Sequence, residues 1–119
     1  MSTKDKGFRG ELLAEKFLKK QGYKIVDRNF ACQFGEIDLI GYRQGVLSFI
    51  EVKARSSGEF GQPVEAVTDK KRKKLIKSAE YFNLKHKIPP SVPCRFDIVS
   101  IILHDDVPQI DFFPNAFTK

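Results

Sequence analysis

The apolar residues of this chain recur with two different periods, and these periods predict where its helices and strands lie. Residues 6–21 carry apolar side chains at helical spacing and are followed by Gly22, which predicts an amphipathic helix that ends there. The segment 23–30 then alternates between apolar and polar residues, as a half-buried strand does. The chain is therefore expected to begin with a helix followed by a strand.

Residues 36–55 predict a β-hairpin whose register follows from its turn. A two-residue turn at Gln44-Gly45, or a four-residue loop centred there, gives one register, whereas a three-residue loop with a bulge shifts it. The first register places two pairs of side chains opposite each other: Asp38 with Glu51, and Glu36 with Lys53.

The second half predicts a helix and two further strands. Thr68 is a good N-cap for a helix over residues 69–83. The segment 94–103 is almost continuously apolar, as a strand covered on both faces would be. Residues 109–117 predict an edge strand that Pro114 ends.

These elements give the order αβββαβ, to which residues 109–117 add a final strand. The fold class is α/β, with a central mixed sheet flanked by helices and a right-handed crossover between its parallel strands. A chain of 119 residues supports a single domain, residues 1–119. Within it, residues 1–5 are expected to be disordered, 56–62 to form a mobile loop, and 85–93 to form an irregular, proline-rich linker.

The composition favours a soluble, cytoplasmic protein with a polyanionic partner. Lys and Arg outnumber Asp and Glu by 21 to 15, a net charge of +6. Cys32 and Cys94 are isolated and lack metal-ligand spacing, which indicates reduced thiols. The first residues contain no apolar signal segment, and no apolar run approaches the roughly 20 residues that cross a bilayer.

The predicted hairpin places two carboxylates where like charges destabilise a sheet. Opposed side chains have Cβ atoms roughly 4.5–5.5 Å apart, so Asp38 and Glu51 would need a shared proton or a cation between them. Two hard oxygen ligands suit Mg²⁺ or Mn²⁺, which could activate water and neutralise a phosphodiester. Lys53 would stabilise developing negative charge or help to deprotonate the water, and Glu11 on the first helix could reach towards the sheet.

Each of these residues also has a purely structural interpretation. Asp38, Glu51 and Lys53 could form a charge cluster at the end of a sheet. Glu11 could be solvated at the border of its helix, and Glu36 is expected to support the site by pairing with Lys53 rather than to bind metal. Asp97, an acid within an apolar strand, is expected to hold a backbone group or an arginine.

The basic run at the start of the second predicted helix suggests contacts with nucleic acid. Lys70, Lys74 and Lys77 share one stripe that could follow a phosphate backbone, whereas Lys71 lies on the apolar side and could face the carboxylates. Arg55 continues the face of the strand that carries Glu51. An ordinary solvated basic face is the alternative.

Five stretches carry a resemblance to a known family: "GFRGELLAEKFLKKQGYKIVDRNF", "GEIDLI", "FIEVKAR", "FGQPVEAV" and "RFDIVSI". In this order they resemble the bacterial YraN-like family, whose members carry a PD-(D/E)XK nuclease core similar to archaeal Holliday junction resolvases. The resemblance implies a restriction-endonuclease-like fold, with Asp38 and Glu51 as metal ligands, Lys53 as the catalytic lysine and Glu11 as a holder of metal-bound water. Ile37 stands where the superfamily name has proline.

Three functions follow as hypotheses. The first is a metal-dependent endonuclease acting on DNA, in particular branched or structured DNA, with RNA as an alternative partner. The second is a non-catalytic nucleic-acid-binding module on the same fold. The third is a scaffold that dimerises through exposed Phe112, Phe113 and Phe117; a homodimer is also compatible with the first two.

Overall fold

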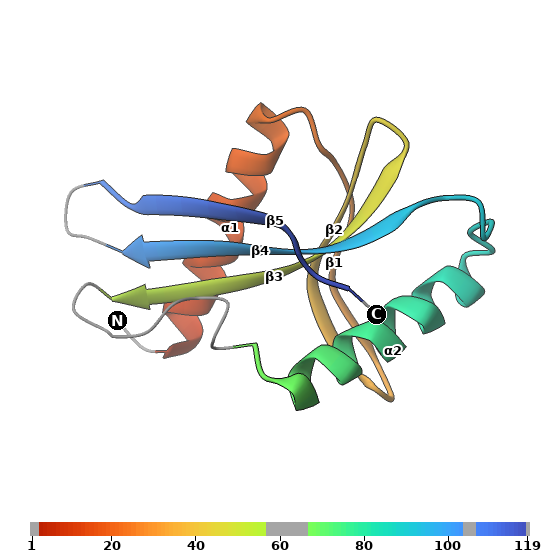
Figure 1. Cartoon of the computed structure of the whole chain (residues 1–119). Coiled ribbons are helices and arrows are strands. Elements are labelled where there is room, and N and C mark those ends of the chain that lie inside the picture. Colours follow the sequence, from red (N-terminus) through yellow and green to blue (C-terminus); the bar gives the residue numbers. More distant parts are fainter. Residues whose placement is uncertain (1–2, 57–66, 104–106, 119) are drawn as a thin grey trace.

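Five strands form one mixed sheet in the computed structural model, which describes residues 3–56, 67–103 and 107–118 (Figure 1). The elements in chain order are α1 (Thr3–Lys20), β1 (Lys24–Cys32), β2 (Gly35–Arg43), β3 (Val46–Ser56), α2 (Asp69–Lys85), β4 (Cys94–Leu103) and β5 (Gln109–Phe117). The strands lie side by side in sequence order. Among the described strands, only β3 and β4 are parallel neighbours, and α2 lies between them in the chain. The expected α/β domain with a mixed sheet and a final edge strand is confirmed.

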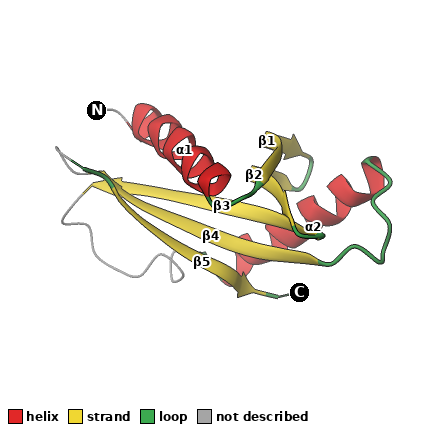
Figure 2. Ribbon diagram, turned by 90° about the horizontal axis from the view of Figure 1, so that it is seen from above, coloured by secondary structure: helices red, strands yellow, loops and turns green. Residues whose placement is uncertain are grey.

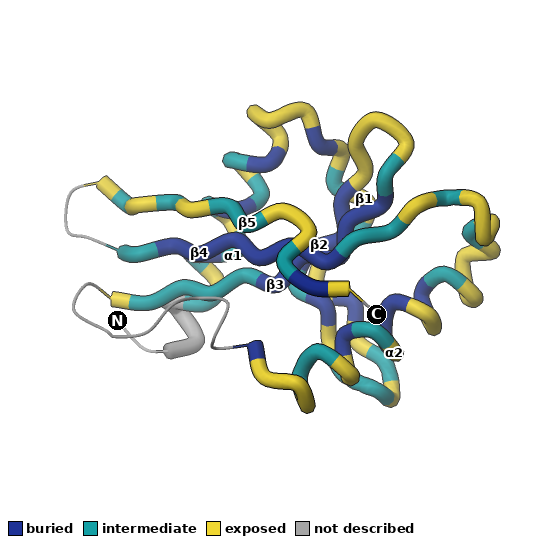
Figure 3. Tube along the Cα trace, in the orientation of Figure 1, coloured by how far each residue is buried: buried dark blue, intermediate teal, exposed yellow. Residues whose placement is uncertain are grey.

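The two helices cover opposite faces of this sheet (Figure 2). On one face, α1 packs on β3 and β4 over a core that includes Leu18, Ile50 and Val99. On the other, α2 packs mainly on β2 over a core that includes Phe49 and Phe82. The first half of β3 and the middle of β4 are buried as a consequence (Figure 3), which explains the continuous apolar run of β4.

The first helix is longer than the sequence predicted. It begins at Thr3, so residues 3–5 are helical although disorder was expected there; no proline or glycine interrupts this segment. Gly22 ends the helix region as predicted, with a φ of +95° that favours glycine. Near the other end, a Cβ added to Gly10 would lie 2.5 Å from the Cβ of Ala54, so a glycine lets α1 approach β3 closely.

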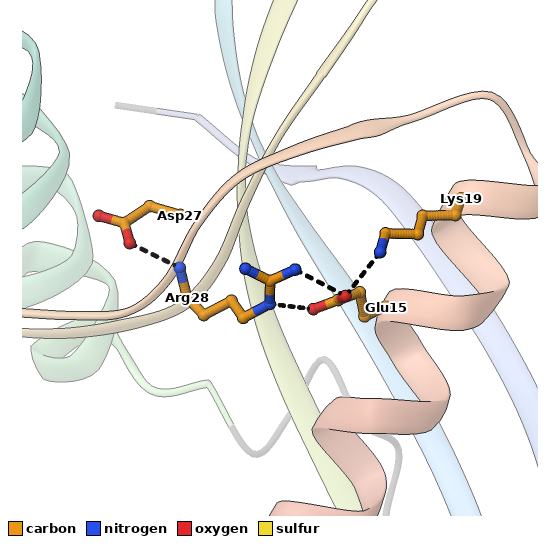
Figure 4. Close-up of polar contacts among 4 residues, drawn as sticks. All are labelled: Glu15, Lys19, Asp27 and Arg28. Carbon is orange, nitrogen blue, oxygen red and sulfur yellow. Dashed lines mark hydrogen bonds and ion pairs between the residues drawn. The ribbon is translucent and has the colours of Figure 1, made fainter.

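A bidentate ion pair fastens α1 to β1 (Figure 4). The Arg28 guanidinium donates two hydrogen bonds to the Glu15 carboxylate, one of them at 2.8 Å from Nη2 to Oε2. Lys19 approaches the same carboxylate at 2.9 Å. The hydrogen bonds from Arg28, and to a smaller extent the contact with Lys19, lower the pKa of Glu15 to about 2.

The hairpin register is confirmed near its turn and lost further along. Gln44 and Gly45 both have positive φ, as a type I′ turn requires, and the ladder runs from the pair next to the turn to Leu39–Ile50. Beyond that pair, β2 separates from β3 and stays hydrogen-bonded to β1 (Figure 1). The predicted facing pairs Asp38–Glu51 and Glu36–Lys53 both lie beyond the end of this ladder, so neither forms as a cross-strand pair. On its other side, Glu36 pairs with Ala31 of β1.

The last strand does not stop at Pro114 as predicted. It continues to Phe117 through a register shift that contains Asn115 at a φ of +52°. The buried carboxylate of Asp97 holds this irregularity, because it accepts a 2.7 Å hydrogen bond from the Asn115 amide and another from Arg95 Nε. The structural role expected for Asp97 is confirmed.

The predicted exposed phenylalanine patch is wrong. Phe117 is buried and stacks on Phe96, with ring centroids 5.0 Å apart. Phe112 packs edge-on against Phe17, and Phe113 is also half-buried. A scaffold that dimerises through these three rings has no support in the fold.

The remaining segments fit the expected organisation in part. Residues 86–93 are irregular, although Lys85 still belongs to α2. Residues 1–2 and 57–62, for which disorder and a mobile loop were expected, lie outside the described residues. Neither helix in the described part of the chain has the length and apolar character needed to cross a membrane.

Candidate functional site

A cleft of about 510 Å³ opens between the separating part of β2, the middle of β3 and the first turns of α2. The separation of β2 from β3 matters here, because it turns two adjacent strands into two walls. The lining residues are Gly35, Glu36, Asp38, Glu51, Thr68, Lys70, Lys71, Lys74 and Leu75. Both carboxylates singled out in the sequence thus face the same cleft.

Asp38 lies at the point where β2 leaves the ladder. Its Oδ2 accepts a 2.8 Å hydrogen bond from the amide of Val52, so the side chain satisfies a β3 donor beyond the end of the β2–β3 ladder. Burial, and secondarily the charge of Glu51, raises the pKa of Asp38 to about 7. The site thus contains two carboxylates close enough to repel each other.

Glu51 is the more buried carboxylate, with 6% of its surface exposed. Its Oε1 lies 2.6 Å from Lys71 Nζ and 3.9 Å from Lys53 Nζ. Burial together with the neighbouring Lys71 ammonium lowers the pKa of Lys53. Burial acts in the same direction on Lys71, but its contacts with Glu51 and Lys53 outweigh it and raise the pKa of Lys71.

The start of α2 directs Lys71 into the cleft. Thr68 caps the helix, its hydroxyl accepting a 3.3 Å hydrogen bond from the Lys71 amide, as predicted. Leu75, one turn on from Lys71, is buried against the sheet. The expectation that Lys71 faces the carboxylates is confirmed, and it is the nearest cation to Glu51 among the ion pairs of the described residues.

Glu11 interacts electrostatically with Glu36 and Glu51 but does not line the cleft. It is half-buried on α1, beside a separate small hollow that includes Asn29. Burial, then the charges of Glu36 and Glu51, raises its pKa, although a hydrogen bond with Asn29 opposes this. Its predicted role as a further acid of the site is therefore supported by these electrostatic effects alone.

The donor chemistry of the cleft fits a hard divalent cation of the Mg²⁺ or Mn²⁺ type. Such ions bind through one or two carboxylates and keep several waters, and Asp38 and Glu51 supply that number. Across the described ranges, no group of three or more His, Cys, Asp and Glu side chains is placed to hold a metal ion. Lys71 already provides one positive charge beside Glu51.

The predicted nucleic-acid contacts divide into three groups. Lys70 and Lys74 line the cleft, Lys77 lines a neighbouring hollow, and Arg55 lies further along β3, half-buried. Sequence reasoning missed Gly35 as a lining residue and assigned Thr68 only a capping role. Gly35 itself was the available signal in the sequence, because a glycine lets the start of β2 lie close to α2.

Comparison with known proteins identifies the family. The uncharacterised protein family UPF0102 matches residues 10–101. The chain belongs to this family. A UPF0102 protein of Lachnoclostridium phytofermentans is 40% identical over 117 residues, covering 98% of this chain and 96% of the relative. UPF0102 proteins of Clostridium perfringens and Geobacter metallireducens are 43% and 39% identical, covering 97% and 98% of this chain and 95% of each relative.

The expected membership of the YraN-like family is thereby confirmed, as UPF0102. The matches cover nearly all of this UPF0102 chain and of each relative, so the aligned proteins are similar in length. The names of these relatives state the family and no reaction, so the nuclease core stays a prediction.

Proposed function

We propose that this UPF0102 protein is a metal-dependent endonuclease that hydrolyses phosphodiester bonds in DNA, particularly branched or otherwise structured DNA. The observation that carries the proposal is the joint exposure of Asp38 and Glu51 to one cleft, with Lys70 and Lys74 on its α2 wall. Carboxylates suit a metal and lysines suit phosphates, so a cleft with both on its walls favours a phosphodiester substrate.

The sequence resemblance supports the same proposal. The motif residues Asp38, Glu51 and Lys53 follow the order of a PD-(D/E)XK core, and an α/β sheet with helices on both faces is compatible with a restriction-endonuclease-like fold. The net charge of +6 favours a polyanion. RNA is the alternative substrate on the same grounds.

The chain's own groups have distinct parts in this proposal. Asp38 and Glu51 would hold a divalent cation, which supplies charge neutralisation and water activation when bound. Lys53, 3.9 Å from Glu51, would stabilise negative charge that develops on the phosphate. Lys70 and Lys74 would position the strand by its phosphates.

The deciding experiment compares metal binding with cleavage. Calorimetric titration of Mn²⁺ and Mg²⁺ is expected to give binding in the wild type and none in Asp38→Asn, whose amide oxygen can still accept from Val52. Cutting of a four-way junction and of its linear arms should require metal and disappear in Lys53→Ala. Asp111→Asn, an exposed acid on β5, is the matched control and should behave as wild type. Absence of metal binding even with DNA present would overturn the proposal.

A non-catalytic nucleic-acid-binding module is the second candidate, and one contact favours it. Lys71 lies 2.6 Å from Glu51 and partly neutralises it, which lessens the need for a cation. This module would bind DNA in a salt-sensitive way without metal-dependent cutting, and Lys53→Ala would leave its behaviour unchanged.

A further inference from the structure

Next to the cleft lies a second hollow of about 630 Å³, which the proposed reaction does not use. The turn between β1 and β2 forms one side of it, and the second half of α2 forms the other. Its lining residues are Gln33, Phe34, Lys77, Glu80, Tyr81 and Leu84.

Aromatic and apolar side chains are presented to solvent in this hollow. Tyr81 is 37% exposed and Leu84 is 80% exposed. The rings of Phe34 and Tyr81 meet edge-on, with centroids 6.3 Å apart. Phe30, which is buried, supports Tyr81 from beneath at 6.1 Å. The result is a supported aromatic surface rather than a single exposed ring.

The hollow follows the cleft along α2 without sharing a lining residue with it. Phe34 precedes Gly35, which lines the cleft, and Lys77 lies one helical turn beyond Lys74, which also does. A hydrogen bond of 3.5 Å from Cys32 Sγ to Ser78 Oγ holds the turn against α2. The two hollows therefore both lie between the β1–β2 hairpin and α2.

A row of cations runs along α2 from the cleft to the hollow. Lys70, Lys74 and Lys77 are spaced four and three residues apart, so they lie on one side of α2 and span about 10 Å. All three are exposed. These three lysines are therefore spaced to follow the phosphates of one strand from the cleft towards the aromatic surface.

We infer that the hollow binds an unstacked base of an unpaired nucleic-acid strand whose phosphates follow these three lysines. The inference rests on the proposed function and narrows its substrate to structures with an unpaired segment beside the cleavage point. Every base has a π-face, so stacking on Tyr81 and Phe34 is tolerant of sequence. Glu80 disfavours a phosphate inside the hollow but can accept hydrogen bonds from base amino groups. Charge complementarity favours this occupant over an apolar peptide or a second copy of the chain.

The test uses the full chain in metal-free buffer, so that binding is measured without cleavage. The probes are a blunt DNA duplex and the same duplex with a single-stranded overhang that carries 2-aminopurine. We expect quenching of the 2-aminopurine on binding, and a roughly tenfold loss of affinity for the overhang probe in Tyr81→Leu and in Phe34→Leu. In Tyr81→Leu the new side chain keeps apolar bulk against Phe30, and in both variants the stacking face is removed. Tyr81→Phe should retain wild-type affinity.

Matched controls separate stacking from general charge and exposure effects. Tyr42→Leu removes another exposed tyrosine, 43% exposed on β2, and should leave binding unchanged. Lys77→Gln should reduce the salt dependence of overhang binding, whereas Lys73→Gln, which lines neither hollow, should not.

The outcomes distinguish this inference from the proposed function. Wild-type-like overhang binding in both leucine variants, or an equal loss for the blunt duplex, would overturn the stacking site while metal-dependent cleavage could still stand. Quenching that depends on Tyr81 in a protein that never cleaves would keep the stacking site and remove the nuclease. Loss of self-association in Tyr81→Leu, measured by sedimentation without DNA, would assign the hollow to a second copy and overturn the inference.

Discussion

Lys71 Nζ lies 2.6 Å from Glu51 Oε1, and this ion pair joins the start of α2 to the middle of β3 across the cleft. The carboxylate is buried, with 8% of its side chain exposed, whereas 36% of the lysine side chain is exposed. The pair therefore has two consequences: it stabilises an otherwise costly buried charge, and it competes with any other cation for Glu51.

Lys71→Met should destabilise the fold by about 1–3 kcal/mol, because it leaves a buried charged acceptor without its nearest partner. Urea unfolding at neutral pH measures this change. Lys73→Met, at an exposed position of the same helix, should change stability by less than about 0.5 kcal/mol. Equal stability of the two variants would show that Lys53 and solvent are enough to stabilise the Glu51 carboxylate.

The same substitution should tighten metal binding. Removing the Lys71 charge relieves repulsion of a divalent cation, and about 1.4 kcal/mol of relief corresponds to a tenfold gain in Mn²⁺ affinity. Calorimetry on Lys71→Met and Lys73→Met, which lose the same net charge, measures the local effect. Identical affinities would mean that Lys71 does not compete for the carboxylates.

Gly10→Ala should destabilise the protein by about 1–3 kcal/mol, even though alanine favours helices. The added methyl would lie 2.5 Å from the Cβ of Ala54, which forces α1 away from β3. Gly7→Ala is the matched control, because its Cβ would meet nothing within 4 Å, and it should stabilise by about 0.5–1 kcal/mol. Thermal unfolding of both variants, and partial rescue of Gly10→Ala by Ala54→Gly, test the packing explanation.

The contact between Glu15 and Arg28 should make stability depend on acid pH. The pKa of Glu15 is lowered from 4.5 to about 2, so the folded state holds this proton less tightly than the unfolded state. The contribution is therefore fully present above about pH 4.5 and is lost as the pH falls towards 2. A carboxyl NMR titration should show the low pKa, and Arg28→Ala should return it towards 4.5. A Glu15 pKa near 4.5 in the wild type would contradict the bidentate pair.

The features that could be predicted from sequence are those set by local chemistry. Gly45 suits a positive φ and Gln44 adopts one as well, so the turn and the adjacent register followed from these two positions. Thr68 fixed the start of α2, and with it the helical phase that turns Lys71 towards the sheet. The same register predicted that Asp38 and Glu51 lie close together, and they do line one cleft, although the ladder ends one pair before them.

The features that could not be predicted depend on contacts between distant segments. The hairpin register gave no sign that β2 would leave β3 after Leu39, because that separation depends on pairing with β1. Phe112 and Phe117 lie in the last strand, and they are covered by Phe17 and Phe96 from distant parts of the chain. The electrostatic effect of Glu51 on Glu11 depends likewise on how α1 packs on the sheet.

The hydrogen bond from the Val52 amide to Asp38 gives the site a reporter that needs no label or substitution. The amide belongs to the backbone of β3, yet its acceptor is the side chain that we propose as a metal ligand. A proton or cation arriving at Asp38 weakens that acceptor, so the amide resonance of Val52 should move and its hydrogen should exchange faster. One backbone signal can thus follow occupancy of the cleft in the native protein, whichever ligand arrives there.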